Sequence, residues 1–405
     1  MVANSSQCRQ RCQHGPVLEL ALARIEEREP EVQAFAWLDV ERARRLARTA
    51  PPGPLHGVPV GVKDIIDTAG IPTENGSRLY RGRVPARSAT VVDRLEQAGA
   101  VVVGKTVTAE LAYFTPGPTR NPWDPTRTPG GSSMGSAAAV AAGMLALAVG
   151  TQTNGSVIRP AAFCGVVGFK PSAGLIPSNG IMSFSPTLDQ VGGFAASVAE
   201  AATLCSVLAA ADLSPEVLER PRLAVAMTSE WSECQPAARE RFETAVAALG
   251  PVARPPLPRG FEEAIGVHRT IMAVEAQRGL GPEVERAPEL VSRRLRDLLE
   301  EGAGISGAEY QAALAERAAL IERFAEWAAG YDAILTLPTL GEAPPLETTG
   351  DPRLCTRWTL VGAPAISLPA GRGPAGLPLG LQLAAQPGAD RRLLGAAAWV
   401  ESRLA

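Results

Sequence analysis

The chain has 405 residues, and 39 basic residues against 42 acidic ones leave a formal net charge of −3. Because charges of both signs are mixed along the sequence, no electrostatic footprint for nucleic acid or for an acidic membrane surface is present, and a small neutral or weakly charged substrate is the expected partner. The length allows one large α/β domain or two smaller ones, with a substantial core.

The six cysteines are scattered without C-x-x-C pairs, which is typical of reduced thiols in a cytoplasmic protein. The N-terminus lacks the apolar segment of a secretory signal. Residues 137–149 form the longest run of small apolar side chains, which is too short to span a bilayer and predicts a buried helix. Cys8, Cys12 and His14 lack a second half with metal-ligand spacing, so no metal is expected there.

The N-terminal third alternates between helical and strand patterns. Apolar residues at helical spacing predict a helical hairpin interrupted at Pro30, and a short apolar strand then ends at Lys63 and Asp64. This alternation is typical of an α/β sheet. The predicted helices cover residues 18–25, 31–47, 90–97 and those from 109 onward, and the predicted strands cover 57–64 and 100–103.

Charge nearly disappears between residues 126 and 193, where glycine, serine, threonine and small apolar residues dominate. Such a composition indicates closely packed backbone or a functional site. The chain then becomes charged and helical over 212–330. Helices are predicted over 238–249, 287–301 and 308–329, and strands over 331–337 and 364–369.

Residues 99–106, GAVVVGKT, match the phosphate-loop pattern G-x-x-x-x-G-K-[ST]. A phosphate loop needs a strand before its first glycine and a helix at its Lys-Thr, whereas here the helical pattern comes first and Ala-Val-Val-Val predicts a buried strand. Gly99 then fits the end of a helix. Nucleotide binding is therefore a distant alternative.

Residues 131–135, GSSMG, match the nucleophile elbow G-x-S-x-G, but no apolar strand precedes them. The elbow also needs a histidine after the serine, and of the three histidines only His268 follows it. The segment around His268 predicts a charged surface helix, so a Ser-His-Asp enzyme stays only as an alternative. Cys164 is a further candidate nucleophile, but it has no candidate base nearby, so we expect it to be a buried packing residue.

A serine nucleophile without histidine needs another base, and a buried lysine is the usual substitute. Lys63 follows the apolar strand Val-Pro-Val-Gly-Val, where burial would depress its pKa. A drop of about three units corresponds to roughly 4 kcal/mol, which requires a buried, preorganised site. The structural alternative is a lysine paired with Asp64 or Asp67.

Several ordered motifs surround this lysine: GVPVGVKD at 57–64, PGGSSMGS at 129–136, GTQTNGSVIRPAAFCG at 150–165, GVVGFKP at 165–171 and LDQVG at 188–192. Together they resemble the amidase signature family, whose serine hydrolases use a Ser-cisSer-Lys triad. The resemblance implies an α/β fold, a single large domain over residues 1–405 with a central mixed β-sheet covered on both faces by helices. It also implies a catalytic core over 57–195 and a variable helical substrate-site region over 205–330.

Carried over by position, the resemblance assigns Ser156 as nucleophile, Ser132 as the serine after a cis peptide bond and Lys63 as the base. The small-residue turn before Ser156 allows the backbone amides of Thr153, Asn154, Gly155 and Ser156 to converge on an oxyanion. Without the ordered motifs, glycine-rich packing and helix capping by Ser132 and Ser133 would explain these serines.

The chain departs from the family pattern at four positions. Gln152 and Asn154 stand where the family commonly has aspartate and glycine, Met134 replaces a usual glycine, and Arg159 lies one position later than the usual arginine. We hypothesise that Arg159 or Asn154 serves a substrate with a polar or carboxylate-bearing group. The alternative is that Arg159 braces the loop against an acidic residue. Ser133, Met134, Gln152 and Arg159 are therefore candidate supporting or substrate-binding residues.

The implied activity is hydrolysis of a carboxamide to a carboxylic acid and ammonia through an acyl-enzyme, with no metal or organic cofactor. The alternative is the glutaminase-type A subunit of a tRNA-dependent amidotransferase, which needs a partner protein, and a non-catalytic scaffold is a third reading. A small-molecule amide is the expected partner, without nucleic acid or membrane, in the cytoplasm; a homodimer stays open.

Overall fold

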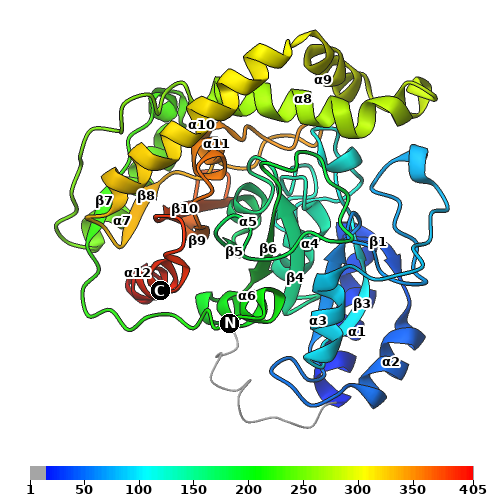
Figure 1. Ribbon diagram of the computed structural model, residues 1–405. Coiled ribbons are helices and arrows are strands. Elements are labelled where there is room, and N and C mark those ends of the chain that lie inside the picture. Colours follow the sequence, from blue (N-terminus) through cyan, green and yellow to red (C-terminus); the bar gives the residue numbers. More distant parts are fainter. Residues whose placement is uncertain (1–14, 405) are drawn as a thin grey trace.

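A ten-stranded mixed sheet crosses the middle of the protein in the computed structural model, which describes residues 15–404 (Figure 1). Its strand order is β1-β3-β2-β4-β6-β5-β9-β10-β8-β7. The strands are β1 (Phe35–Leu38), β2 (Pro59–Lys63), β3 (Val101–Thr106), β4 (Leu147–Gln152), β5 (Val167–Lys170), β6 (Gln190–Ala195), β7 (Leu223–Val225), β8 (Ala333–Thr336), β9 (Ala365–Arg372) and β10 (Pro378–Ala384).

Strand β2 lies between β3 and β4 and is parallel to both. All five of its residues are buried, as are those of β3 and β4, which is the expected environment of parallel strands covered on both faces. Val62 stands opposite Val149 in the register. Because parallel strands end at the same edge of a sheet, the carboxyl ends of β2 and β4 bring Lys63 and Thr151 together.

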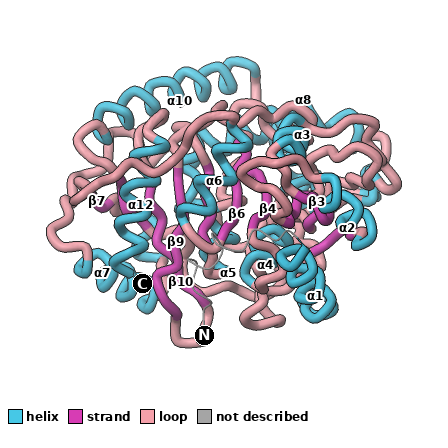
Figure 2. The backbone as a smooth tube through the Cα atoms, turned by 90° about the horizontal axis from the view of Figure 1, so that it is seen from below, coloured by secondary structure: helices cyan, strands magenta, loops and turns pink. Residues whose placement is uncertain are grey.

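Helices cover both faces of the sheet, and Figure 2 shows the strands side by side with helices around them. One apolar cluster packs α3, α6, α7 and α12 on one face, and another packs α1, α2, α4 and α5 on the other. The bounds are α1 (Gly15–Val32), α2 (Val40–Thr49), α3 (Thr90–Gln97), α4 (Met134–Ala141), α5 (Ile158–Cys164), α6 (Val198–Ala209), α7 (Pro236–Ala248) and α12 (Asp390–Leu404).

Four further helices form a third group that lies together in Figure 1. They are α8 (Ala264–Val284), α9 (Arg293–Gly304), α10 (Gly307–Ala328) and α11 (Arg353–Leu360). At their centre Phe261 stacks on Phe324, and both rings meet Trp358 edge to face, with centroids 5.6–5.8 Å apart. The protein is thus a single α/β domain of the predicted class.

The structure confirms the prediction that residues 99–106 hold a buried strand after a helix end, in place of a phosphate loop. Residues 99–106 include β3, a strand inside the sheet, and Gly99 follows α3 with φ +86°. An added Cβ at Gly99 would lie 2.3 Å from the Pro51 carbonyl, so both the conformation and the packing require glycine.

Some predicted elements are wrong at their ends. The helix predicted from residue 109 onward is only a short 3-10 turn, Glu110–Ala112. The residues predicted as one helix over 137–149 instead form the end of α4 and the beginning of β4, with a turn between them. The helix predicted over 31–47 is divided, because residues 35–38 form β1 and α2 begins only at Val40. Helix α1 continues through Pro30, where the sequence predicts an interruption. Among residues 15–404, no helix combines the length and apolar character needed to cross a membrane.

Candidate active site

Lys63 is fully buried at the carboxyl end of β2, and within residues 15–404 its Nζ forms hydrogen bonds only with hydroxyl groups. Nζ donates to Ser132 Oγ and to Thr151 Oγ1, each at 2.8 Å. Burial lowers the pKa of Lys63 to about 7, and the charge of Asp189 opposes this shift. A neutral amine that holds a serine hydroxyl can act as a general base.

Ser132 and Ser133 directly precede α4, and the Gly131–Ser132 peptide bond is cis, as the family resemblance implies. Ser133 does not face the lysine. Its Oγ donates to the Thr151 carbonyl at 3.2 Å and accepts from the Thr151 amide at 3.3 Å, which ties the start of α4 to β4. A Cβ at Gly150 would lie 2.6 Å from this Oγ, so the tie requires glycine there.

Ser156 lies in the turn between β4 and α5, residues 153–157, which we call the Ser156 turn, and it lines a cavity of about 20 Å³. The structure brings Lys63 and Ser132 into contact, but no hydrogen bond within residues 15–404 joins Ser132 to Ser156. The cavity is lined by Ala112, Tyr113, Phe114, Thr153, Asn154, Ser156, Arg159, Phe184 and Met272.

Gln152 supports the Ser156 turn from the end of β4. Its Oε1 accepts from the amides of Val157 and Ile158 at 2.8 and 3.0 Å, and its Nε2 donates to Thr359 Oγ1 at 2.9 Å. The side chain therefore caps the start of α5 and connects it to α11. Met134, which is buried, accepts a hydrogen bond from the Gly117 amide, and neither Gln152 nor Met134 lines the cavity.

Arg159 reaches the cavity from α5 although its relative exposure is only 2 %. Its Nη2 donates to the Gly131 carbonyl at 2.7 Å and to Thr349 Oγ1 at 3.3 Å, and its guanidinium lies over the Phe114 ring. Nε and Nη1 have no partner, and no carboxylate of residues 15–404 forms an ion pair with it. The expected brace against an acidic residue is thus replaced by one against a backbone carbonyl.

The helix that carries His268 is buried, contrary to prediction. The sequence predicts a charged surface helix, but α8 packs against α9, α10 and α11, and His268 is 1 % exposed. Its Nε2 donates to the Thr153 carbonyl at 2.8 Å, and burial lowers the pKa of His268 to about 4. The ring contacts the Ser156 turn through a carbonyl, so it is not placed as the base of a Ser-His-Asp triad.

Two threonines of α11 also hold the Ser156 turn, and no sequence motif marks them. Thr356 Oγ1 donates to Asn154 Oδ1, and Thr359 Oγ1 donates to the Asn154 carbonyl, both at 2.6 Å. Asp189, which lies in the LDQVG motif, accepts from Thr153 Oγ1 at 2.6 Å. The side chains around Ser156 therefore come from widely separated parts of the chain.

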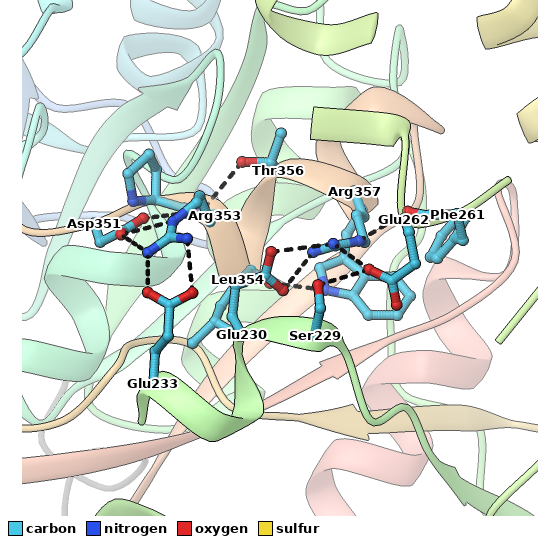
Figure 3. A network of polar contacts seen from close by, with 12 residues as sticks. Ser229, Glu230, Glu233, Phe261, Glu262, Asp351, Arg353, Leu354, Thr356 and Arg357 are labelled. Atoms are coloured by element: carbon cyan, nitrogen blue, oxygen red, sulfur yellow. Dashed lines mark hydrogen bonds and ion pairs between the residues drawn. The ribbon is translucent and has the colours of Figure 1, made fainter. Parts of the chain in front are cut away.

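Helix α11 is itself anchored by the ion pairs that Figure 3 shows. Arg357, 1 % exposed, donates to both carboxylate oxygens of Glu230 at 2.8 and 3.1 Å and to Glu262 at 2.9 Å. Arg353 pairs with Glu233 and Asp351 at its more exposed end. This network fixes the helix that carries Thr356 and Thr359.

Metal-ligand clusters of three or more His, Cys, Asp or Glu side chains do not occur within residues 15–404. Cys8, Cys12 and His14 lie outside the described residues. Cys164 is fully buried, as expected, and burial raises the pKa of its thiol well above the usual range.

Comparisons with known proteins agree with the α/β fold. The amidase family model matches residues 16–394. The A subunit of glutamyl-tRNA(Gln) amidotransferase from Synechococcus sp. (strain RCC307) is 34% identical over 93% of this chain and 91% of that protein, and its counterpart from Anaeromyxobacter sp. (strain K) is 35% identical over 96% and 92%. A solved amidase structure is 32% identical, covers 96% of each chain and has a TM-score of 0.88.

These findings define an α/β enzyme that acts on the carbon–nitrogen bond of amides. The chain belongs to the amidase signature family. The solved structure of the A subunit of glutamyl-tRNA(Gln) amidotransferase from Thermotoga maritima is also similar, with 30% identity, a TM-score of 0.80 and coverage of 95% of this chain and 90% of that chain. The names of these relatives include a tRNA, which conflicts in part with the expectation of no nucleic-acid partner.

Proposed function

We propose that this enzyme hydrolyses a carboxamide to a carboxylic acid and ammonia through an acyl-enzyme on Ser156. The observation that carries the proposal is the buried amine of Lys63, held between the hydroxyls of Ser132 and Thr151 with a pKa lowered to about 7. Since no carboxylate contacts Nζ among residues 15–404, the neutral amine is well populated at neutral pH.

In the proposed mechanism, neutral Lys63 accepts the proton of Ser132, and Ser132 takes the proton of Ser156 as its Oγ attacks the amide carbonyl carbon. Ser132 then donates a proton to the nitrogen of the tetrahedral intermediate, and ammonia leaves. Water adds to the resulting ester with its proton passing back along the same path. The acid is released, and Ser156 regains its hydroxyl proton.

The oxyanion of each tetrahedral intermediate is proposed to lie among the backbone amides of Thr153, Asn154, Gly155 and Ser156. We place the catalytic core within residues 57–195 and the substrate-site cover within 205–330. Met272 of α8 lines the cavity beside Ser156, which supports the second assignment. Cytoplasmic location and a homodimer stay predictions.

Arg159 is proposed to bind an anionic group of the substrate. A buried cation without a counter-ion is costly, and the free Nε and Nη1 of this guanidinium are donors that a carboxylate would satisfy. Asn154 shares the cavity lining, although its Oδ1 already accepts from Thr356. The proposed substrate is therefore a small amide that carries a carboxylate.

A second candidate is the glutaminase-type A subunit of a tRNA-dependent amidotransferase. It is favoured by the relatives that carry this name, which align with the present chain over 91–92% of their own length. Glutamine is an amide that carries a carboxylate, so the same cavity serves both proposals. What separates them is whether the ammonia is released or delivered in a complex with partner subunits.

Mass spectrometry after treatment with a fluorophosphonate tests the shared chemistry. A single adduct on Ser156 is expected in the wild-type chain, and none in Ser156→Ala. Ammonia release is then measured from glutamine and from neutral and carboxylate-bearing amides by the purified single chain. Turnover by the chain alone supports the stand-alone amidase, whereas activity that requires added amidotransferase partner subunits supports the second candidate. An unlabelled Ser156 in folded protein contradicts both.

A further inference from the structure

The three carbonyl groups that precede Ser156 each accept a hydrogen bond from a different helix. His268 Nε2 of α8 donates to the Thr153 carbonyl at 2.8 Å, and Thr359 Oγ1 of α11 donates to the Asn154 carbonyl at 2.6 Å. The Arg159 amide of α5 donates to the Gly155 carbonyl at 2.9 Å. Every peptide plane between Thr153 and Ser156 is therefore held from outside.

The direction of these carbonyls determines the direction of the amides. In a planar trans peptide the C=O of one residue and the N–H of the next point opposite ways. Each N–H group of Asn154, Gly155 and Ser156 therefore points away from the helix that holds the carbonyl of the residue before it. Those three N–H groups have no acceptor among residues 15–404, so they can receive an oxyanion.

His268 is suited to this task by its protonation state. The ring is fully buried, its pKa is lowered to about 4 by that burial, and the carbonyl of Thr153 only accepts. The neutral tautomer with its proton on Nε2 is therefore the stable form. Donation to a carbonyl also polarises the peptide group, which makes the following N–H a stronger donor.

We propose that His268 and Thr359 are positioning residues of the oxyanion hole, which aim the amides of Asn154 and Gly155 through the carbonyls behind them. This inference rests on the proposed acyl-enzyme chemistry at Ser156. Neither side chain touches the substrate in this scheme. Both act on the reaction by orienting the backbone, and they come from parts of the chain far from the family's serine-lysine motifs.

The test measures the rate at which a fluorophosphonate labels Ser156, because the phosphonyl oxygen develops its charge where the substrate oxyanion does. His268→Leu and Thr359→Val are each expected to slow labelling about tenfold or more, since loss of one oxyanion donor costs about 10² to 10³ in rate. His268→Gln, whose amide NH₂ replaces the Nε2–H donor, and Thr359→Ser are expected to recover most of the rate. His56→Leu, a histidine outside the site, is the matched control.

With an amide substrate, the positioning role predicts a lower kcat with little change in KM, whereas general damage lowers the melting temperature and affects both. Labelling of His268→Leu and Thr359→Val at the wild-type rate overturns the inference, and so does a slow His268→Gln variant that melts like wild type. If His268→Leu does not fold, the nearly isosteric Thr359→Val carries the test. An unlabelled wild-type chain overturns the proposed function itself, and this inference with it.

Discussion

Two regions of this protein differ in how they surround buried basic side chains. In the anchor of α11, Arg357 is surrounded by the carboxylates of Glu230 and Glu262, and every direction of its fork is used (Figure 3). Around the cavity, Lys63 and Arg159 are equally buried but contact only hydroxyls, carbonyls and an aromatic ring among residues 15–404. In these two regions, the basic side chain that has its own carboxylates anchors a helix, whereas those that have none lie where we propose that the substrate reacts.

The largest effect is expected at Lys63, whose buried amine is the proposed general base and forms no ion pair within residues 15–404. Lys63→Met should reduce kcat/KM by about 10³-fold or more, because a general base contributes about 10² to 10⁴. The free energy of unfolding should not fall, since burial already disfavours the charged amine. Ammonia release and urea denaturation measure the two quantities. A Lys63→Met enzyme that retains its turnover would contradict the mechanism.

The opposite outcome is expected for Glu230→Gln in the anchor. This change leaves the buried guanidinium of Arg357 with only the half-exposed carboxylate of Glu262, so the free energy of unfolding should fall by about 3 kcal/mol, the lower end of the range for a broken buried pair. The matched control is Glu243→Gln, which breaks the exposed pair with Arg254 and should cost less than about 1 kcal/mol. Equal effects in urea denaturation would remove the distinction between the two regions.

Arg159→Met should separate substrates rather than destabilise the fold. For amides that carry a carboxylate, KM is expected to rise by about 10- to 100-fold, which corresponds to the roughly 1.5–3 kcal/mol of a charged hydrogen bond. Neutral amides should show a much smaller change. Arg159→Lys keeps the charge and tests whether the planar fork is needed. The same KM increase for neutral and charged amides would assign Arg159 to loop support alone.

The smallest expected effect is the pH dependence of the wild-type enzyme. The pKa of Lys63 is lowered to about 7, so the neutral, active amine is lost below that pH and kcat/KM should fall about tenfold per unit of further acidification. His268, with a pKa lowered to about 4, stays neutral across this range and should add no second limb near pH 6. An acidic limb centred near pH 6 that disappears in His268→Gln would point to the histidine instead.

The sequence predicts those helices and strands whose own residues show a clear apolar periodicity. Helix α3 is confirmed at its predicted bounds, and β8, β9, α7 and α10 lie within a few residues of prediction. Strand β1, which is not predicted, and helix α8, which is predicted to lie at the surface, are packed against neighbours from distant parts of the chain. Because α8 is buried on more than one side, its apolar residues form no simple stripe, and its charged residues, such as Arg269, Glu275 and Arg278, wrongly indicate a surface helix.

The contact between Lys63 and Ser132 could be expected from the family resemblance that the ordered motifs carry. Thr151, His268, Thr356 and Thr359 could not be identified in the same way. Each side chain contacts the site through one or two hydrogen bonds, and no sequence pattern near these residues predicts their partners. Only the register of β2 with β4 and the docking of α8 and α11 show those pairings.

The place of α11 in the chain has a consequence for biosynthesis. Lys63, Ser132 and Ser156 all belong to the first 160 residues, whereas Thr359 lies about 200 residues after Ser156. A ribosome therefore makes the proposed nucleophile long before it makes the helix that we propose orients the backbone around it. If both proposals hold, the nascent polypeptide is a poor catalyst until synthesis is nearly complete, and a fragment that ends before α11 carries all three motif residues but lacks the hydrogen bond from Thr359 to the Asn154 carbonyl.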